Sequence, residues 1–123
     1  MSVVRSVQLT LSLQGDVLTV AQLAGVGGAK LTAQLIPLCH AVSLSWVDVR
    51  LSLDEGAQAV LIQAEAQATG PTGVEMEALT AVTVAGLTVY DMVKGVSKAA
   101  RITDVQLEAK AGGRSGDYRR TPP

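Results

Sequence analysis

The 123-residue sequence is poor in several residue types that build reactive or metal-binding sites. It contains one cysteine, one histidine and no phenylalanine, and aromatic residues make up only 2% of the chain. A single cysteine excludes an intramolecular disulfide. A structural zinc site usually needs four ligands, whereas the chain has only these two Cys and His side chains. Nothing in the sequence therefore requires a metal or another cofactor, and we expect one domain with a core of Val, Leu and Ala.

Neither the charge nor the hydropathy of the chain predicts a nucleic-acid or membrane partner. Ten basic and eleven acidic residues leave a net charge of -1, which argues against nucleic-acid binding over the whole surface. The longest uncharged run, Leu31 to Val47, is interrupted by Pro37 and His40 and does not suit a membrane span. The N-terminus lacks a secretory apolar run. We expect a soluble intracellular protein, with the choice between cytoplasm and mitochondrion left open.

The charges are unevenly distributed along the chain. Residues 1–97 carry four basic and eight acidic side chains, whereas residues 98–123 carry six basic and three acidic ones. The basic end is also rich in glycine, from Lys110 to Arg120. Glycine allows close approach of the backbone to an anion, and Lys or Arg supplies a countercharge for phosphate. This end is therefore either a phosphate-binding segment or a solvated C-terminal tail.

Hydrophobic periodicity predicts six elements in the order strand, helix, strand, strand, helix, strand. Period-two alternation predicts strands over residues 3–13, 43–53, 58–68 and 101–110, with a bulge at Trp46-Val47. Helical spacing predicts helices over 17–36 and 74–99, the first capped by Asp16 and ended by Pro37. This order fits an α+β, ferredoxin-like (split βαβ) domain with an antiparallel sheet and two long helices on one face.

Apolar residues at helical spacing also predict which face of each helix is buried. The predicted stripes are 17, 20, 24, 31 and 35 in the first helix, and Leu79, Val82, Leu87 and Tyr90 in the second. In the third strand, Val60, Ile62, Ala64 and Ala66 share one face.

The adjacent pair Cys39-His40 is the first of three segments that concentrate reactive side chains. The two residues could be a nucleophile with its base or two zinc ligands. The alternative is a buried cysteine beside a hydrogen-bonded histidine. Adjacent side chains on an extended segment point to opposite faces, so the pair is not expected to form a nucleophile-base contact.

The other two segments lie near opposite ends of the second predicted helix. Glu75 and Glu77 stand in its first turn, where carboxylates either complement the helix dipole or bind a guanine-like amide edge and transfer protons. Asp91 and Lys94 are three residues apart, as in an ion pair. Fourteen residues of continuous helix separate Glu77 from Asp91 by roughly 21 Å. If all the segments serve one site, some must therefore come from a second subunit.

At these residues the sequence resembles the cyclic pyranopterin monophosphate synthases, the MoaC (molybdenum cofactor biosynthesis protein C) family. The segments that carry the resemblance are Gly15-Asp16, Leu35-Ile36-Pro37-Leu38-Cys39-His40, Thr72-Gly73-Val74-Glu75-Met76-Glu77-Ala78-Leu79-Thr80, Tyr90-Asp91-Met92 with Lys94, and Lys110 before Gly112-Gly113. The resemblance covers about residues 15–119. It implies an enzyme that converts a 3′,8-cyclised dihydro-GTP to cyclic pyranopterin monophosphate and releases pyrophosphate. It also implies dimers that form a trimer of dimers, with sites between subunits.

The resemblance also implies roles for single residues. Asp91 matches the catalytic aspartate and Lys94 its companion lysine. Two stretches match substrate-binding segments: Leu38, Cys39 and His40, and Glu75, Met76 and Glu77. Lys110 matches a lysine near the phosphates, and Arg114 is a further candidate cation. On this basis Cys39 serves packing or positioning rather than nucleophilic attack.

The sequence departs from the family pattern near its start. The family carries a lysine directly before Gly-Asp, and here that position is Gln14. Residues 1–14 do not resemble the family, so we divide the chain into an N-terminal strand or extension (1–14) and a MoaC-like domain (15–120). This pattern predicts a truncated or divergent start. It also leaves open a catalytically impaired subunit that assembles with a complete paralogue.

Overall fold

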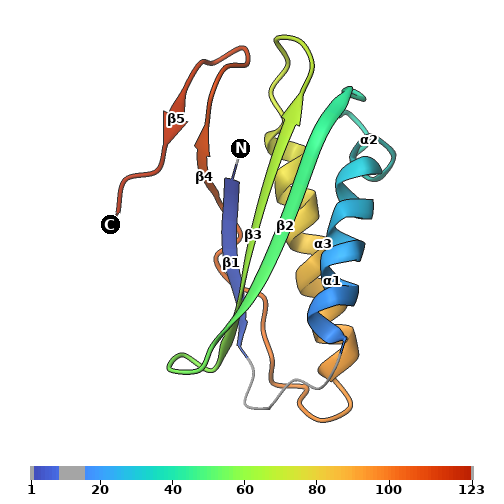
Figure 1. The fold of residues 1–123 in the computed structure, drawn as a ribbon, viewed down its shortest axis with the longest axis vertical. Coiled ribbons are helices and arrows are strands. Elements are labelled where there is room, and N and C mark those ends of the chain that lie inside the picture. Colours follow the sequence, from blue (N-terminus) through green and yellow to red (C-terminus); the bar gives the residue numbers. More distant parts are fainter. Residues whose placement is uncertain (1, 9–15, 123) are drawn as a thin grey trace.

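The computed structural model describes residues 2–8 and 16–122, which form one antiparallel sheet covered by helices on one side (Figure 1). The strands are β1 (Ser2–Gln8), β2 (Leu44–Asp54), β3 (Ala59–Ala68), β4 (Leu107–Lys110) and β5 (Tyr118–Arg119). The helices are α1 (Val17–Lys30), α2 (Thr32–Leu35) and α3 (Glu75–Val93). The strand order is β2-β3-β1-β4-β5, and each neighbouring pair is antiparallel. The fold is therefore α+β, with α1 and α3 packed together against the sheet.

The two strands of the β2–β3 hairpin follow the predicted pattern closely. Val60, Ile62, Ala64 and Ala66 of β3 are each at most 1% exposed, which confirms that they share the core face. In β2 the register shifts between Leu44 and Trp46, which places an irregularity next to the bulge predicted at Trp46-Val47. The predicted turn between the strands is also confirmed. There, the Asp54 carboxylate accepts a hydrogen bond from the Ala57 backbone N–H at 3.1 Å.

The first predicted helix is interrupted at Leu31 and divides into α1 and α2. Asp16 precedes α1, but its side chain makes no capping hydrogen bond; instead its backbone carbonyl accepts from the Val20 N–H at 2.7 Å. The predicted stripe is wrong at Val20, Leu31 and Leu35, which are 39%, 46% and 52% exposed. The buried side of α1 is lined mainly by small residues: Val17, Ala21, Gly25, Gly28 and Ala29.

Close approach between the two long helices explains why small residues line this interface. A Cβ atom on Gly25 would lie 2.9 Å from the Ala81 backbone oxygen, and one on Gly28 would lie 2.8 Å from Cγ2 of Val84. Both distances are shorter than real Cβ contacts, so a larger side chain here would force α1 away from α3. On the same helix, the larger Leu23 is 68% exposed.

The second predicted helix ends earlier than expected, at Val93 instead of Ala99. Val96 and Ser97 both donate backbone hydrogen bonds to the Val93 carbonyl, so the chain turns before Gly95-Val96 can extend the helix. The buried positions of α3 include Ala78, Val82, Ala85, Val89 and Val93. Leu87 is 55% exposed and is not a core residue, whereas Leu79 and Tyr90 are partly buried.

By length and composition α3 is apolar enough to cross a membrane, and no other helix of the described residues is. Half of its most apolar stretch is buried inside the domain, as in the core helix of a soluble protein.

The chain ends differ most from the predicted elements. The last predicted strand, 101–110, is regular only from Leu107, and Asp104 has a positive φ of 56° that interrupts extended backbone. The short strand β5 was not predicted; it pairs with β4 and makes the basic end a hairpin. At the N-terminus, β1 confirms the strand predicted over 3–13 as far as Gln8, while residues 9–15 lie outside the described part. The predicted boundary between residues 14 and 15 falls there and stays a prediction.

Candidate functional site

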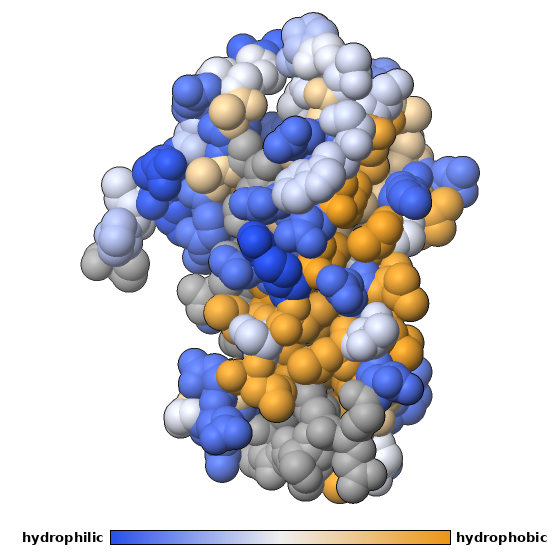
Figure 2. All heavy atoms as spheres, viewed as in Figure 1, coloured by the Kyte–Doolittle hydropathy of each residue, from blue (hydrophilic) through white to orange (hydrophobic). Residues whose placement is uncertain are grey.

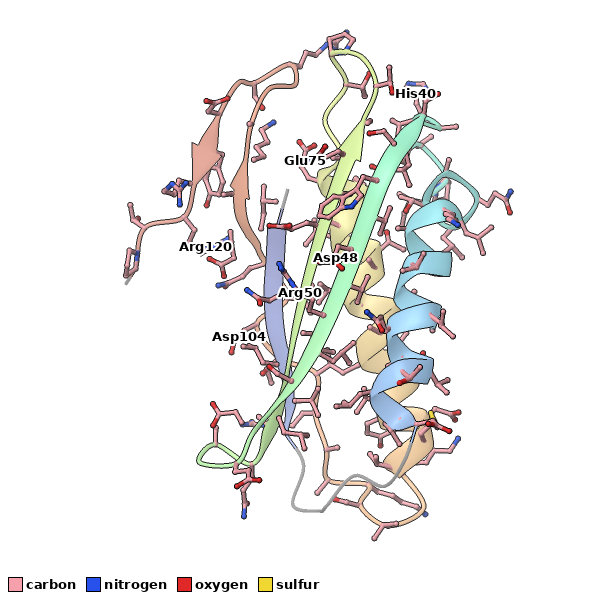
Figure 3. All side chains as sticks on the ribbon, in the orientation of Figure 1. His40, Asp48, Arg50, Glu75, Asp104 and Arg120 are labelled. Carbon is pink, nitrogen blue, oxygen red and sulfur yellow. The ribbon has the colours of Figure 1, made fainter. Side chains whose placement is uncertain are left out.

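The side chains predicted to form a site gather at the two ends of α3. Glu75, Met76 and Glu77 begin the helix, and Asp91 lies in its last turn with Lys94 directly after it. Figure 3 shows the labelled Glu75 and His40 at the same end of the molecule, where α3 begins and the chain enters β2. The structure therefore separates two groups of predicted residues. The first group lies around Glu75 and Glu77 at the start of α3, and the second consists of Asp91 and Lys94 at its end.

The centre of the first group is an ion pair between Glu75 and Lys110. Lys110 Nζ lies 3.0 Å from Glu75 Oε1, and the lysine side chain is only 8% exposed. The Glu75 backbone N–H, followed by the Lys110 side chain, holds the pKa of the Glu75 carboxyl below its ordinary value, and these effects outweigh partial burial. A side chain at Gly73 would come close to the Glu75 carboxylate, so that carboxylate would have to move to accommodate it.

Glu77, two residues further along the same helix, has the opposite electrostatic environment. It is only 3% exposed. Burial raises the pKa of the Glu77 carboxyl, a hydrogen bond from its own backbone N–H acts against this, and the negative charge of Glu75 raises it further. Two carboxyl groups with pKa values shifted in opposite directions are suited to different roles, one as a fixed anion and one as a proton carrier.

Cys39 lies close enough to Glu77 for their charges to interact. Burial, and then the negative charge of Glu77, raise the pKa of the Cys39 thiol, which disfavours the reactive thiolate. Its Sγ donates a hydrogen bond to the backbone oxygen of His40 at 3.7 Å, rather than to the imidazole. These contacts fit packing or positioning better than nucleophilic attack. His40 is exposed and Leu38 is 94% exposed, so both are open to a ligand or a partner.

Two hollows adjoin the first group. Lys110 lines a cavity of about 540 Å³ beside the β4–β5 hairpin, together with Glu65, Ala109, Ala111, Asp117, Tyr118 and Arg119. Met76 instead lines an apolar hollow of about 260 Å³ between α2 and α3, with Leu35, Ile36, Leu79, Thr80, Thr83 and Val84. Met76 is thus on a different surface from Lys110. Arg114 does not line the larger cavity, and Arg119, which sequence analysis did not single out, does.

The second group is an ion pair in solvent. Lys94 Nζ lies 2.8 Å from Asp91 Oδ1, and the two side chains are 56% and 69% exposed. The hydrogen bond and negative charge of Asp91 raise the pKa of Lys94. Because α3 is continuous from Glu75 to Val93, the fourteen residues between Glu77 and Asp91 span roughly 21 Å. One copy of the chain cannot place both groups around one small substrate.

Ser115 is a contact residue that sequence analysis missed. Its Oγ accepts a hydrogen bond from Lys110 Nζ at 2.7 Å. The only available signal was its place in the glycine-rich basic end, five residues after Lys110, and the pairing of β4 with β5 was needed to bring the two together. Within residues 2–8 and 16–122, no three His, Cys, Asp or Glu side chains lie close enough to hold a metal ion.

Comparison with known proteins agrees with the sequence motifs. The chain is 59% identical over 110 residues to a cyclic pyranopterin monophosphate synthase of Streptomyces griseus subsp. griseus, covering 89% of this chain and 61% of the relative. It is 59% identical over 107 residues to the mitochondrial protein of that name in Arabidopsis thaliana, covering 87% of this chain and 40% of the relative.

A third relative is a longer protein, of which this chain matches a small portion. The Mus musculus molybdenum cofactor biosynthesis protein 1 is 62% identical over 107 residues, covering 87% of this chain and 17% of the relative. The chain thus spans between 17% and 61% of the length of these three relatives. A family model described as the MoaC family matches residues 1–113, and the chain therefore belongs to the MoaC family.

Proposed function

We propose that the protein acts in molybdenum cofactor biosynthesis as a cyclic pyranopterin monophosphate synthase. Its substrate is 3′,8-cyclo-7,8-dihydroguanosine 5′-triphosphate, and its products are cyclic pyranopterin monophosphate and pyrophosphate. The observation that carries the proposal is the 59% identity over 110 residues to the Streptomyces synthase. The geometry adds support because the motif residues at the start of α3 are clustered and are held by specific contacts.

Lys110 and Glu77 suit two separate needs of this reaction. Closing the cyclic phosphate forms a bond from a substrate hydroxyl oxygen to the α-phosphorus, breaks the bond from that phosphorus to the bridging oxygen, and releases pyrophosphate. Such a step depends mainly on positioning and on neutralising negative charge, for which the Lys110 ammonium is suited. The hydroxyl proton and the protons moved in rebuilding the purine-derived ring need carriers. Glu77, with its raised pKa, His40 and Asp91 are the candidates.

The distance along α3 supports a site shared between copies of the chain. Asp91 and Lys94, the proposed catalytic pair, are exposed and lie roughly 21 Å along the helix from Glu77. We propose that a neighbouring copy brings its Asp91 and Lys94 to the Glu77 end, in dimers that form a trimer of dimers.

Exposed apolar side chains on the helices support this assembly. Leu23, Leu31, Leu35 and Leu87 are 46% to 68% exposed. In the view of Figure 2, hydrophobic surface gathers toward the α1 side, while hydrophilic surface covers the β4–β5 side. Apolar surface of this kind is suited to contact between proteins.

Three further assignments accompany this proposal. The strand order β2-β3-β1-β4 and the antiparallel pairing support the ferredoxin-like topology, with β5 as an added edge strand. The protein is proposed to be soluble and intracellular, in the cytoplasm or in mitochondria; the Arabidopsis relative is named as mitochondrial. Neither a nucleic acid nor a membrane is proposed as a partner, and no cofactor is assigned.

The direct test is turnover by the purified chain. Incubation with the cyclised dihydro-GTP should release pyrophosphate and form a pterin product. Because Gln14 stands where the family has a lysine, the same assay with Gln14→Lys should give equal or higher turnover. Absence of turnover in both proteins would refute the assignment as an active synthase.

Complementation between two inactive variants tests the shared site. Glu77→Gln and Asp91→Asn should each abolish turnover. A mixture allowed to exchange subunits should recover about a quarter of wild-type activity, because half of randomly formed dimers carry one intact site out of two. A mixture as inactive as the single variants would contradict a site shared between copies.

Gln14 favours one alternative function, an impaired subunit that assembles with a complete paralogue. Native mass spectrometry of the chain co-expressed with a complete MoaC-family paralogue would then detect mixed oligomers. Exclusive homo-oligomers would contradict this alternative.

A further inference from the structure

The loop between β4 and β5 has a shape fixed by its own hydrogen bonds. The Asp117 Oδ1 atom accepts from the Gly112 backbone N–H at 2.9 Å, and the Gly116 N–H donates to the Gly113 carbonyl at 3.3 Å. Gly112 and Gly113 have φ angles of 76° and 78°, a left-handed conformation that favours glycine. Residues 111–117 therefore form an ordered turn rather than the solvated tail that composition alone allowed.

This loop is anchored at both of its sides. On one side, the Arg120 N–H donates to the Glu108 carbonyl at 2.7 Å, and Arg120 Nε donates to the Leu107 carbonyl at 2.9 Å. On the other side, Gly113 lies against Gly73, since a Cβ on Gly113 would be 3.4 Å from the Gly73 Cα. The loop thus packs onto the segment that leads into α3 and Glu75.

The result of this arrangement is that the Lys110 ammonium has two acceptors among the described residues. They are Glu75 Oε1 at 3.0 Å and Ser115 Oγ at 2.7 Å. An ammonium group has three N–H donors, so one remains for a ligand in the cavity that Lys110 lines. The two contacts set the direction of that third donor. The lysine side chain is only 8% exposed, so it has little freedom to turn away from them.

The two acceptors differ in charge, and this difference matters for anion binding. The Glu75 carboxylate offsets part of the attraction of the ammonium for an anion, whereas the Ser115 hydroxyl holds the ammonium without adding negative charge. A second carboxylate in place of Ser115 would repel an anionic ligand. A hydroxyl fixes Nζ in position and leaves the attraction of Lys110 for phosphate in place.

We propose that Ser115, held by the loop that Asp117 closes, is a positioning residue that orients the Lys110 ammonium toward a phosphate group of the substrate. The sequence motifs named Lys110 without its contacts, and the structure adds the residues that hold it. The proposal rests on the proposed function in one respect, namely that the natural ligand carries a phosphate chain.

Binding of inorganic triphosphate, measured by calorimetry on the full chain, tests this without requiring turnover. Ser115→Ala should weaken binding about tenfold, as expected for losing a hydrogen bond to a charged group. Ser115→Thr keeps the hydroxyl and should restore most of the affinity. Ser52→Ala is the matched control, because Ser52 is an exposed serine of β2 whose side chain makes no hydrogen bond with another described residue.

A double variant separates positioning from a merely structural role. If Ser115 acts through Lys110, Ser115→Ala should change nothing further in a Lys110→Met background. Three results would each overturn the proposal. They are an equal loss of triphosphate binding in both backgrounds, unchanged binding by Ser115→Ala, and no triphosphate binding by the wild-type protein. If Ser115→Ala does not fold, two variants of Asp117 provide the test. Asp117→Ala should weaken triphosphate binding, whereas Asp117→Asn should not, because it keeps an acceptor for the Gly112 N–H. Equal binding by these two variants would also overturn the proposal.

Turnover distinguishes failure of this inference from failure of the proposed function. A wild-type protein that binds triphosphate through Lys110 and Ser115 but does not convert the cyclised dihydro-GTP would refute the synthase assignment and leave the positioning role intact. In an active enzyme, Ser115→Ala should raise KM about tenfold with a smaller change in kcat, because the contact serves binding of the phosphate chain.

Discussion

Replacing Gly25 and Gly27 of α1 by alanine should change stability in opposite directions, although the two glycines are only two residues apart. A Cβ on Gly25 would meet the Ala81 backbone oxygen at 2.9 Å, Val49 Cγ1 at 3.2 Å and the Ala85 Cβ at 3.3 Å. A Cβ on Gly27 would meet nothing within 4 Å. Both substitutions replace glycine inside a helix, so they share the same gain in helix propensity and differ only in their surroundings.

The magnitudes follow from these distances. Alanine is favoured over glycine inside a helix by about 0.5–1 kcal/mol, which should appear as a gain in stability for Gly27→Ala. Overpacking a filled interior destabilises by about 1–3 kcal/mol. The Gly25 value should lie in the upper part of that range, because the nearest atom is a backbone oxygen that cannot rotate away. We expect Gly25→Ala to be net destabilising by about 1–2 kcal/mol.

Urea unfolding followed by circular dichroism measures both changes at a fixed protein concentration. The midpoints of the two variants should lie on opposite sides of the wild-type midpoint and differ by about 1 M urea. Equal midpoints for Gly25→Ala and Gly27→Ala would refute the conclusion that α1 and α3 are in backbone contact at Gly25.

Three other perturbations test the core and the candidate site. Gly28→Ala should be destabilising by about 1–3 kcal/mol, and adding Val84→Ala should recover part of that loss, because the colliding atoms belong to the Val84 side chain. If the shift in urea midpoint of the double variant equals the sum of the two single shifts, this contact is contradicted. Between about pH 4 and 8 the two carboxyl groups should affect stability in opposite ways. The raised pKa of Glu77 means that its contribution is lost as the pH rises above the ordinary glutamate value, so Glu77→Gln should gain stability relative to wild type toward pH 8. The lowered pKa of Glu75 gives a contribution that is present at neutral pH and lost as the pH falls through the folded-state value, so Glu75→Gln should be destabilising at pH 7 and less so as the pH falls below the ordinary glutamate value; parallel pH profiles for the two variants would contradict the assigned environments. Asp91→Asn should abolish turnover while leaving the urea midpoint of unfolding nearly unchanged, because the Asp91–Lys94 pair is exposed; a large loss of stability would mean that the pair is structural.

The strands were more predictable than the helix surfaces, for a physical reason. Ile62 and Ala64 alternate with polar residues, and period-two alternation fixes which face of a strand is buried. In the first predicted helix, 17–36, the stripe of large apolar residues included Leu31 and Leu35, which are exposed and lie beyond the end of α1. The buried face of α1 is formed mainly by small residues, which allow α3 to approach closely. Which small residues are buried therefore depends on the position of α3 and not on hydropathy.

The candidate site divides in the same way. The local strings around His40, Glu77 and Asp91 carry the family resemblance, and the length of α3 already required the last two to be far apart in one chain. Contacts between segments distant in sequence were not predictable. Glu75 and Lys110 are 35 residues apart and meet because β4 passes the start of α3.

By itself, the sequence determined the family, the α+β order of elements, the core face of β3 and the separation of the two reactive groups along α3. These follow from local periodicity, from a fixed helix rise and from specific residue strings. Only the tertiary structure decided that the basic glycine-rich end is a hairpin, that Lys110 is buried between Glu75 and Ser115, and that Glu75 and Glu77 have pKa values shifted in opposite directions. The physical reason is that burial, charge proximity and hydrogen bonding between distant segments arise only when the sheet and helices are packed together.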